Sequence, residues 1–469
     1  MTRCPIYPKP LKNKASLLFI FFSKRRSWLD GLYERSYRMK MGQIKLPGLE
    51  LFMVNQPELV KQVMVDEVDA FPKHRMLGDL LAPLLGESIF TTNGAQWRKQ
   101  RDMLDVAFDN SQVERVFERM QEATTRMLTR LGEHPDGAVV DVDKEMTLVT
   151  ADIIFRTIMS ANLDTEEAMN VLEAFVRFQE ASPKLALLRM FKVPDNWLLR
   201  FSDRKRRGDA KIIRASLERV IRPRYEVFMR GEASEHEDIL ASILRAKDPD
   251  SGQAFGFDEI VDQVAMLFLA GHETSASALT WTLYLLSISP DIQHAAAKEV
   301  TEVLGEERGS VPLAAVKRMG LVRRIFMESM RLYPPVGFLA REVSRDTDMR
   351  DKHLQAGASL VVAPWLLHRH EALWDAPHEF CPARFDPKSG GRSIPKNAYL
   401  PFGMGQRVCI GATFAMQEAV LILSELLRRF SFELAPGFQP DPVGRLTIRS
   451  DNGMHLVLKK RLPETETTA

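Results

Sequence analysis

Residues 402–411 read FGMGQRVCIG and fit the pattern F-x-x-G-x-R-x-C-x-G at all five fixed positions. The pattern constrains the fold because it presents a cysteine on a loop bracketed by glycines, where a helix is expected to begin. Helix N-termini carry partial positive charge and unsatisfied N–H groups, so we expect a lowered pKa for the thiol of Cys409. A thiolate in this setting is suited to be an axial iron ligand. The alternative is a buried cysteine in a turn.

The composition of the chain narrows the class of protein. Of its 469 residues, 45% are hydrophobic and 27% are charged, and the formal net charge is +2. These values are typical of a globular protein and do not indicate nucleic-acid binding. The basic run at 204–207 is expected to be a solvated helix face. Cys4, Cys381 and Cys409 are too few and too scattered for a disulfide framework, which favours a reducing cytoplasm.

The N-terminal region contains an apolar run at 15–22, much shorter than the roughly 20 residues that cross a bilayer. Basic residues precede it as in a signal peptide, but the run is followed by the sequence SKRR at 23–26 and by no small-residue cleavage site. We expect packing onto the domain, with peripheral membrane contact and secretion as alternatives. No linker divides the chain, so we predict a single domain at 31–469, preceded by a mobile N-terminal extension at 1–30.

Hydrophobic periodicity predicts a mainly α protein with a small β portion. Prolines end the predicted helices at 290 and at 334–335. The expected elements, in chain order, are a strand hairpin at 42–54, a helix at 57–69, a leucine-rich loop at 71–96, successive helices at 96–229, a long apolar helix at 258–289, further helix to about 332, strand-like segments at 336–363, an irregular stretch at 364–400, a last helix after Cys409, and a β tail at 446–448 and 455–458.

The long apolar helix contains the sequence LAGHETS at 269–275. A glycine inside a helix costs about 1 kcal/mol relative to alanine, so Gly271 requires a reason. Ala270 and Gly271 remove side-chain bulk, which would let the backbone pass close to a flat cofactor. The hydroxyl of Thr274 can bond to the preceding turn or to a ligand, and Glu273 beside it can carry protons. The alternative is an ordinary capped or exposed Glu-Thr pair.

These motifs resemble those of the cytochromes P-450, the haem-thiolate monooxygenases. The resemblance extends to an E-x-x-R at 328–331, to a W-x-x-x-R at 97–101, and to a P-x-R-F at 382–385 in which Ala383 replaces the usual Glu. The motifs follow the family's order over nearly the whole chain. The resemblance implies a single-domain cytochrome P-450 fold, a triangular helical prism around one buried haem b (iron protoporphyrin IX), with Cys409 as the axial thiolate.

The resemblance also implies roles for individual residues. Oxygen activation and proton delivery would fall to Thr274 and Glu273. Haem would contact Cys409, Phe402, Gly403, Arg407, Gly411, Trp97, Arg101, Arg341, Ala270 and Gly271, and the arginines with Trp97 would hold its propionates. Glu328, Arg331 and Arg384 would form a buried network behind the cysteine loop.

The expected substrate is a hydrophobic small molecule, because the residues that we place around it are all apolar. Fatty acids, terpenoids and aromatic compounds all fit this description. Helices between about 160 and 210 are expected to form a mobile lid. The predicted pocket residues are Leu77, Leu80, Leu81, Phe90, Phe268, Leu269, Ala270, Val336, Phe338, Leu339 and Leu446.

The reaction that the resemblance implies inserts one oxygen atom from O2 into the substrate, by hydroxylation or epoxidation, in a cytoplasmic monomer. Electrons would come from an external ferredoxin or flavodoxin with its NAD(P)H reductase, docked on Arg98, Lys99 and Lys396. Two alternatives remain. One is a peroxide-using haem-thiolate enzyme, although such relatives usually replace the acid–alcohol pair. The other is a haem-binding sensor without turnover.

Overall fold

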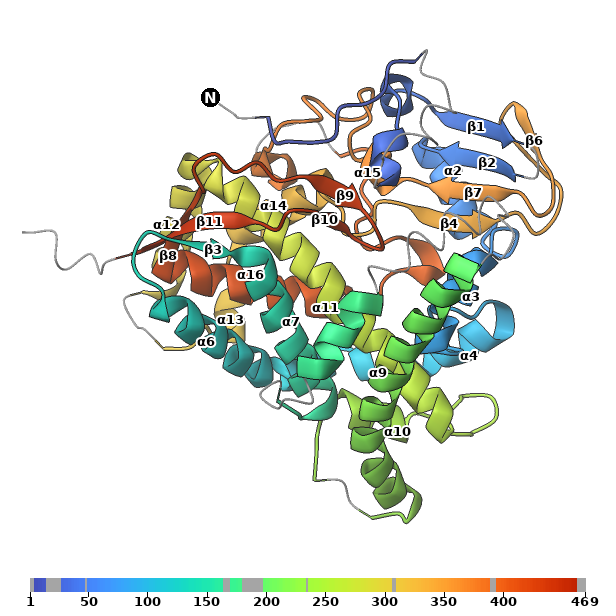
Figure 1. Cartoon of the computed structure of the whole chain (residues 1–469), viewed down its shortest axis with the longest axis horizontal. Coiled ribbons are helices and arrows are strands. Elements are labelled where there is room, and N and C mark those ends of the chain that lie inside the picture. The colour runs from blue at the N-terminus through green and yellow to red at the C-terminus, as the bar shows by residue number, and fades with distance from the viewer. Residues whose placement is uncertain are drawn as a thin grey trace, which may run out of the picture.

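Helices make up most of the molecule, and the strands form small sheets toward its edges (Figure 1). The computed structural model describes residues 4–13, 27–46, 49–162, 169–178, 197–232, 235–305, 309–388 and 394–461. The apolar run at 15–22 and much of the predicted lid lie outside the described residues.

The α-helices are α2 (Pro57–Lys61), α3 (Arg75–Leu85), α4 (Gly94–Asp105), α5 (Asn110–Arg115), α6 (Phe117–Glu133), α7 (Val142–Met159), α9 (Trp197–Met229), α10 (Ile239–Arg245), α11 (Phe257–Ser287), α12 (Pro290–Leu304), α13 (Leu313–Val316), α14 (Gly320–Leu332), α15 (Pro364–Leu367) and α16 (Ala412–Arg429). Short 3₁₀ turns are η1 (Trp28–Gly31), η2 (Glu34–Tyr37), η4 (Val106–Phe108), η5 (Pro382–Phe385) and η6 (Gly405–Arg407), and η3 (Gln62–Asp66) is a π-helical turn.

The strands are β1 (Met41–Leu46), β2 (Leu49–Val54), β3 (Ala138–Asp141), β4 (Leu339–Glu342), β5 (Thr347–Met349), β6 (Lys352–Leu354), β7 (Ser359–Val362), β8 (Phe430–Leu434), β9 (Pro442–Gly444), β10 (Ile448–Ser450) and β11 (His455–Lys460).

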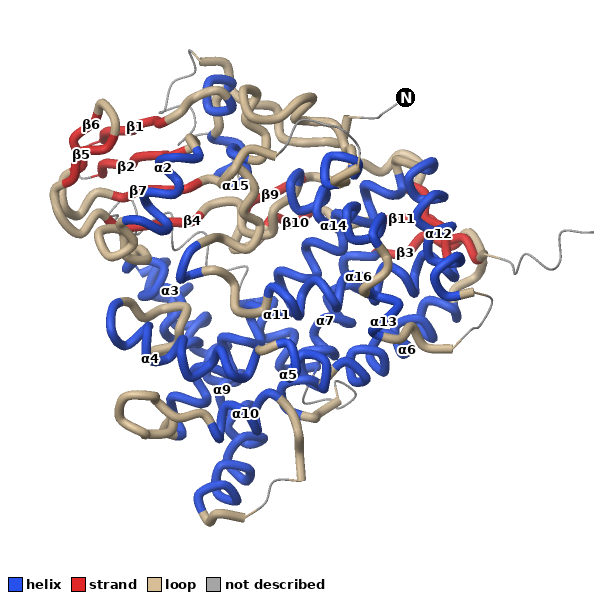
Figure 2. Tube along the Cα trace, turned by 180° about the vertical axis from the view of Figure 1, so that it is seen from behind, coloured by secondary structure: helices blue, strands red, loops and turns tan. Residues whose placement is uncertain are grey.

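The largest sheet joins segments that lie far apart in the sequence. It has the order β1-β2-β7-β4, with β2 and β7 parallel and the other pairs antiparallel. A second sheet has the order β3-β11-β8, and β9–β10 and β5–β6 are two-stranded. Figure 2 shows the first and second sheets on opposite sides of the helical body. This confirms the predicted hairpin near 42–54 and the β tail.

The central element is α11, which crosses the middle of the molecule in both views (Figures 1 and 2). Nearly every side chain from Ile260 to Leu286 is buried, because helices pack on all of its sides. Its N-terminus is capped where the backbone N–H of Gly256 donates to the carboxylate of Glu259, at 2.8 Å. Pro290 then starts α12, so the predicted long helix and its stop are confirmed within two residues.

The leucine-rich segment that we expected to be a loop contains the helix α3. Its N-terminus is capped by His74, whose side chain accepts a hydrogen bond from the backbone N–H of Met76 at 3.2 Å. Leucines at positions 80, 81, 84 and 85 are all buried, and this spacing places them on one helix face. Their burial stabilises the helix despite Pro83 within it, so the prediction of a loop was wrong here.

The described parts of the N-terminal extension pack on the rest of the chain. The backbone of Ile6 accepts a hydrogen bond from the hydroxyl of Tyr333 and donates one to Tyr284 at 3.2 Å. Further along, Ser27 and Trp28 lie against the β9–β10 hairpin. Hydrogen bonds and ring contacts therefore join the described parts of the predicted extension to the rest of the chain.

Candidate functional site: a cysteine loop beside a buried cationic group

Two glycines with left-handed backbone shape the loop before Cys409. Gly403 has φ 71° and Gly405 has φ 69°, a region that other residues rarely adopt. A Cβ at Gly405 would also overlap the carbonyl of Met64 in η3, so the loop can approach η3 only with glycine at this position. The loop closes where the N–H of Cys409 donates to the carbonyl of Phe402, at 2.9 Å. The cysteine then leads into α16.

The thiol of Cys409 keeps exposed surface, although protein surrounds it on most sides. Burial raises its pKa, and the hydrogen bond from the backbone of Gly411 and the charge of Arg101 offset this effect only in part. The expectation of a lowered pKa is therefore wrong for the free thiol. A metal ion at the sulfur would instead favour the thiolate, because a coordinated thiol is deprotonated.

Three cations lie near the cysteine loop, of which Arg341 is buried and the other two are half-buried. Arg407 donates to the carbonyl of Phe71 at 3.0 Å, and Arg341 donates to that of Ala340 at 2.9 Å. The Nε atoms of both arginines have no hydrogen-bond partner within the described part of the chain. Burial, then the charge of Arg407, lowers the pKa of Arg341 to about 10. Unpaired buried guanidinium nitrogens indicate an anionic ligand.

The third cation, Lys73, was missed by the sequence analysis. Its Nζ donates to the carbonyl of Ile89 at 2.5 Å. The backbones of Lys73 and Arg341 are paired by an isolated antiparallel β-bridge. Burial, followed by the charges of Arg407 and Arg341, lowers the pKa of Lys73 to about 7. No sequence motif marks this lysine, and only the packing of residues 71–74 against β4 brings it to Arg341. We call Lys73, Arg341 and Arg407 the cationic cradle.

Trp97 and Arg101, which share one face of α4, take different positions. Two cradle cations approach the Trp97 ring, with Lys73 Nζ 5.9 Å and Arg407 Cζ 5.6 Å from its centroid. Arg101 instead donates to Asp105 at 2.7 Å and to the carbonyl of Val408 at 2.6 Å. Arg101 thus supports the cysteine loop from α4, whereas we had expected it to be a propionate ligand.

The cysteine loop and the cradle fit haem b. A haem needs one axial ligand and partners for two propionate carboxylates, and these residues offer a thiol and three cations. Among the described residues, no group of three or more His, Cys, Asp or Glu side chains could hold a metal ion alone. A porphyrin would supply the remaining iron ligands. A Cβ at Gly411 would meet nothing within 4 Å, so open space lies beside the start of α16.

On α11, the hydroxyl of Thr274 donates to the carbonyl of Ala270 at 2.7 Å, one turn back. Gly271 has a structural cause that differs from our expectation. A Cβ there would lie 2.5 Å from Cδ1 of Ile154, so the missing side chain admits α7 rather than a cofactor. The hydroxyl of Thr150 on α7 also donates to the carbonyl of His272 at 3.0 Å, which fixes this close helix contact.

The carboxylate of Glu273 points to the C-terminal hairpin and away from Thr274. Arg449 donates to it at 2.7 and 3.2 Å, and Thr447 donates at 2.5 Å. Burial alone would raise the pKa of Glu273, but Arg449, then His272 and Thr447, lower it to about 2. Glu273 is therefore an anion near neutral pH. The proton-relay role that we expected for it requires its release from Arg449.

A second acidic residue beside the Thr274 turn was not predicted. Glu418 of α16 is fully buried, and its Oε2 accepts a hydrogen bond from Ser275 at 2.6 Å. Burial raises the pKa of Glu418 to about 8, which Ser275 lowers only in part. Its other oxygen has no partner among the residues described. This contact joins α11 to α16, the helix that follows Cys409.

The structure brings Glu328, Arg331 and Arg384 into one buried network. Arg331 contacts both carboxylate oxygens of Glu328, at 2.7 and 2.8 Å, and Arg384 approaches one of them at 3.2 Å. The N–H of Cys381 donates to the same carboxylate at 2.9 Å. Arg331 also binds the carbonyl of His368 at 2.8 Å. The network ties α14 to the irregular stretch that precedes the cysteine loop.

The predicted pocket residues divide by exposure. Phe268 is fully buried and packs on the rings of Phe155 and Phe175, with centroids 4.7 and 4.4 Å away, so it belongs to the core. Leu80, Leu81 and Leu269 are also buried. Half-buried, and so able to face a ligand, are Leu77, Phe90, Ala270, Val336, Phe338, Leu339 and Leu446.

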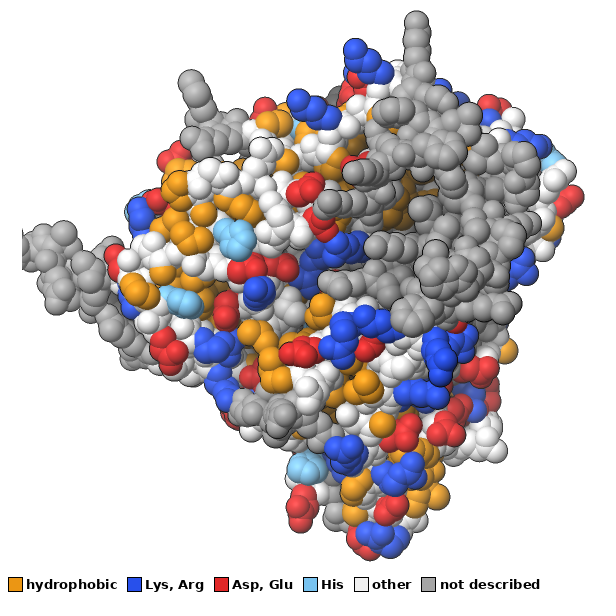
Figure 3. All heavy atoms as spheres, in the orientation of Figure 1, with side chains coloured by type: hydrophobic (Ala, Val, Ile, Leu, Met, Phe, Trp, Pro, Cys, Tyr) orange, Lys and Arg blue, Asp and Glu red, His pale blue; other side chains and the backbone are white. Residues whose placement is uncertain are grey.

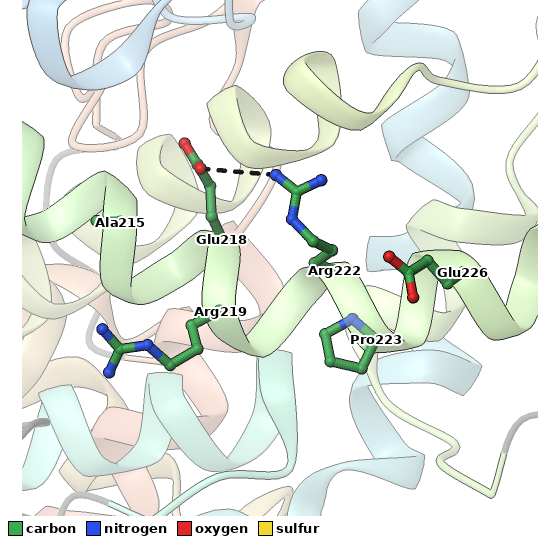
Figure 4. Close-up of a pocket in the computed structure, with 6 residues that line it drawn as sticks. All are labelled: Ala215, Glu218, Arg219, Arg222, Pro223 and Glu226. Carbon is green, nitrogen blue, oxygen red and sulfur yellow. Dashed lines mark ion pairs between the residues drawn. The ribbon is translucent and has the colours of Figure 1, made fainter.

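The described surface carries mixed charge (Figure 3) and an open depression that lies apart from the predicted site residues. Figure 3 shows acidic and basic side chains interspersed over the visible face. An open depression of about 410 Å³ lies on α9 between Ala215 and Glu226 (Figure 4), where Arg222 pairs with Glu218 at 3.8 Å. Its lining comes from one helix and includes none of the predicted site residues. No helix among the described residues is long and apolar enough to cross a bilayer.

Comparisons with known proteins point to one family. The family model for cytochrome P-450 matches residues 20–457. Cyclooctatin synthase of Streptomyces melanosporofaciens is 30% identical over 415 residues, which are 87% of this chain and 86% of that protein. The 11-oxo-beta-amyrin 30-oxidase of Glycyrrhiza uralensis is 29% identical over 421 residues, which are 87% and 78% of the two proteins. The crystal structure of the cytochrome P-450DA haem domain matches with a TM-score of 0.81 and 26% identity over 92% of both chains. The chain therefore belongs to the cytochrome P-450 family of haem-thiolate monooxygenases.

Proposed function

We propose that the protein inserts one oxygen atom of O2 into an apolar small molecule, using haem b held by Cys409. The observation that carries this proposal is the accessible thiol of Cys409 on the same loop as Arg407, whose Nε, like that of Arg341, is buried without a partner among the described residues. Haem bound there would supply the iron at which dioxygen is activated, with electrons from a separate donor.

The chain's own contribution to oxygen chemistry centres on the Thr274 turn. The Thr274 hydroxyl, which now donates to Ala270, can turn its hydrogen bond toward a ligand beside α11. Glu273 would supply protons once Arg449 releases it, and Ser275 and Glu418 lie on the adjacent face. Water exclusion comes from the apolar packing around α11.

The substrate is proposed to be apolar, because the half-buried side chains expected around it are apolar. Relatives are named as an oxidase, a synthase and hydroxylases, which suits hydroxylation or epoxidation and leaves the substrate class open. Soret spectra titrated with fatty acids, terpenoids and aromatic compounds would identify the class. A low-to-high-spin shift with one panel marks the ligand that displaces water from iron.

Electrons are proposed to come from a separate ferredoxin or flavodoxin with its reductase, in a cytoplasmic monomer. Arg98 and Lys99 on α4 and the exposed Lys396 would form the basic rim for this partner, with exposed Val106 and Val408 as apolar contacts. Arg98 is paired with exposed Asp69 at 2.7 Å, a weak interaction that a docking partner could replace.

The test begins with haem loading of the full chain and of Cys409→Ser. We expect a thiolate-type spectrum of the reduced carbon monoxide complex for the wild type and its loss in the variant. Absence of haem binding by the wild type would overturn the proposal. Thr274→Ala should keep the spectrum but divert electrons into hydrogen peroxide. Product formation with an electron donor but not with peroxide excludes the two alternatives, a peroxide-using enzyme and a sensor.

A further inference from the structure

The start of η1 is fixed to the C-terminal hairpin. The side-chain oxygen of Ser27 accepts a hydrogen bond from the N–H of Leu29 at 3.1 Å, which caps η1. The same oxygen accepts one from the N–H of Gly444 at 2.6 Å, at the end of β9. One hydroxyl thus sets both the direction of η1 and its position on the hairpin. Trp28 follows directly and points its ring into the adjoining space.

The indole of Trp28 fills the space that two glycines leave free. A Cβ at Gly337 would lie 2.6 Å from Cη2 of the indole, and a Cβ at Gly444 would also overlap the ring. Neither glycine has positive φ, so the backbone conformation alone would accept other residues. The ring of Phe338 closes a third side, with centroids 3.6 Å apart and an interplanar angle of 70°. The indole therefore explains the glycine at 444 and, together with Cδ1 of Ile448 at 2.9 Å, the glycine at 337.

The two glycines belong to the segments that carry expected substrate contacts. Gly337 lies between Val336 and Phe338, and Gly444 lies two residues before Leu446. The segments are tied together where the N–H of Ile448 donates to the carbonyl of Pro335, at 3.0 Å. On the α11 side, the carbonyl of Ile448 accepts a hydrogen bond from the hydroxyl of Ser277 at 2.7 Å.

A backbone hydrogen bond thus joins the two segments, and the hydroxyl of Ser277 fixes the second of them to α11. On the other side, Ser27 binds the backbone of Gly444, and the indole of Trp28 fills the space between the two segments. Removing the indole would leave Phe338 and the hairpin room to retreat from the pocket. Cores that lose a large side chain collapse only in part, so the pocket wall would shift and loosen.

We infer that Trp28 is a specificity-determining residue, whose indole sets the distance between the Phe338 and Leu446 segments and hence the width of the substrate pocket. The inference rests on the proposed function, because it takes Phe338 and Leu446 as substrate contacts. Trp28 acts through these segments and is a positioning residue.

The first test is a double-mutant cycle on the thermal unfolding of the full-length haem-loaded protein. Gly444→Ala should lower the Tm clearly in the wild type, because the new Cβ overlaps the indole. In a Trp28→Ala background the same change should cost less than half as much, since the space is empty. Equal costs in both backgrounds would overturn the inferred contact. Gly437→Ala, at a positive-φ glycine with nothing within 4 Å of its Cβ, should cost the same in both.

The second test measures pocket width with azoles, which bind haem iron directly and give a spectral Kd. For Trp28→Ala we expect an imidazole Kd within about twofold of wild type and a bulky-azole Kd shifted by about tenfold or more. Trp28→Phe should lie close to wild type. If every azole binds Trp28→Ala with the wild-type Kd, Trp28 does not set the width of the pocket. Failure to bind haem would instead overturn the proposed function, and the cycle remains measurable on the haem-free chain.

Discussion

The guanidinium of Arg449 joins Glu273 on α11 to Asp143 on α7, at 2.7 and 2.6 Å. Thr447 and Arg449 both hold Glu273, and Leu446, an expected substrate contact, is the residue before Thr447. The hairpin that would meet the substrate is therefore also the element that holds the acid beside Thr274. Any movement of this hairpin changes the charge environment of Glu273.

Arg449→Met should reverse the sign of the contribution that ionisation of Glu273 makes to the pH dependence of stability. In the wild type, its pKa of about 2, below the ordinary 4.5, gives stability above pH 4.5 that is lost as the pH falls through 2. Without Arg449 the buried carboxyl is expected to titrate above 4.5, so the variant loses stability as the pH rises. The Tm difference between wild type and variant should widen from pH 4 to 7, and the difference in unfolding free energy should reach about 3 kcal/mol at pH 7.

The matched control is Arg445→Met, on the same hairpin, which removes a more exposed ion pair to Asp451. Its cost should stay below about 1 kcal/mol at every pH. A constant Tm difference for Arg449→Met across this range would show that Arg449 does not hold the pKa of Glu273 down.

Glu418→Gln should remove a loss of stability at rising pH. The pKa of Glu418 is raised by burial to about 8 from 4.5, so between these values the unfolded chain is ionised while the folded chain holds a proton. Wild-type stability therefore falls across this interval. In urea unfolding, the free energy of unfolding of Glu418→Gln relative to the wild type should increase from pH 5 to pH 7 and again from pH 7 to pH 9. Glu433→Gln, at an exposed pair with Lys459, should show no such trend.

Arg341→Met should have opposite effects on the haem-free and haem-loaded protein. In the haem-free chain it relieves repulsion within the cationic cradle, so the Tm should not fall. With haem it removes a charge-assisted hydrogen bond of about 1.5–3 kcal/mol, so haem release to a scavenger should accelerate about tenfold or more. Arg75→Met, which removes an exposed cation 3.7 Å from Glu342, should leave the haem-free Tm and the rate of haem release unchanged. A lower haem-free Tm with unchanged haem release would contradict the proposal that the cationic cradle binds the haem carboxylates.

The cradle also predicts the pH dependence of the haem-free chain. The pKa of Lys73 is lowered by burial, then by Arg407 and Arg341, to about 7 from 10.5. Between these values the unfolded chain holds one more proton, so stability should rise with pH. Lys73→Met should flatten that rise in thermal unfolding measured from pH 7 to 10.

Glu328→Gln should destabilise the fold strongly, because it leaves Arg331 and Arg384 without their carboxylate in a buried setting. We expect a cost of about 3–5 kcal/mol in urea unfolding, with a matching drop in soluble yield. Glu302→Gln, in an exposed pair with Lys298, should cost under about 1 kcal/mol. Similar costs for both variants would contradict a structural role for the network.

Local patterns in the sequence predicted much of the fold. The long helix, its proline stop and the hairpin near 42–54 follow from periodicity and punctuation, which act over a few residues. The segment at 71–96 was misjudged, because the burial of four leucines by distant helices outweighs the loop signals and the proline within it. Residues 163–168 and 179–196, in the predicted lid, lie outside the described residues.

The sequence by itself determined the cysteine loop, because Cys409, Arg407 and the glycines that turn the chain lie within ten residues. It also indicated the Glu328 network and the Thr274 turn. Only the tertiary structure decided which distant residues meet. Lys73 joins Arg341, Arg449 joins Glu273, Glu418 joins Ser275, and Trp28 joins Gly444. These partners lie more than 140 residues apart, so no local pattern records them, and their charge and burial depend on the packing that brings them together.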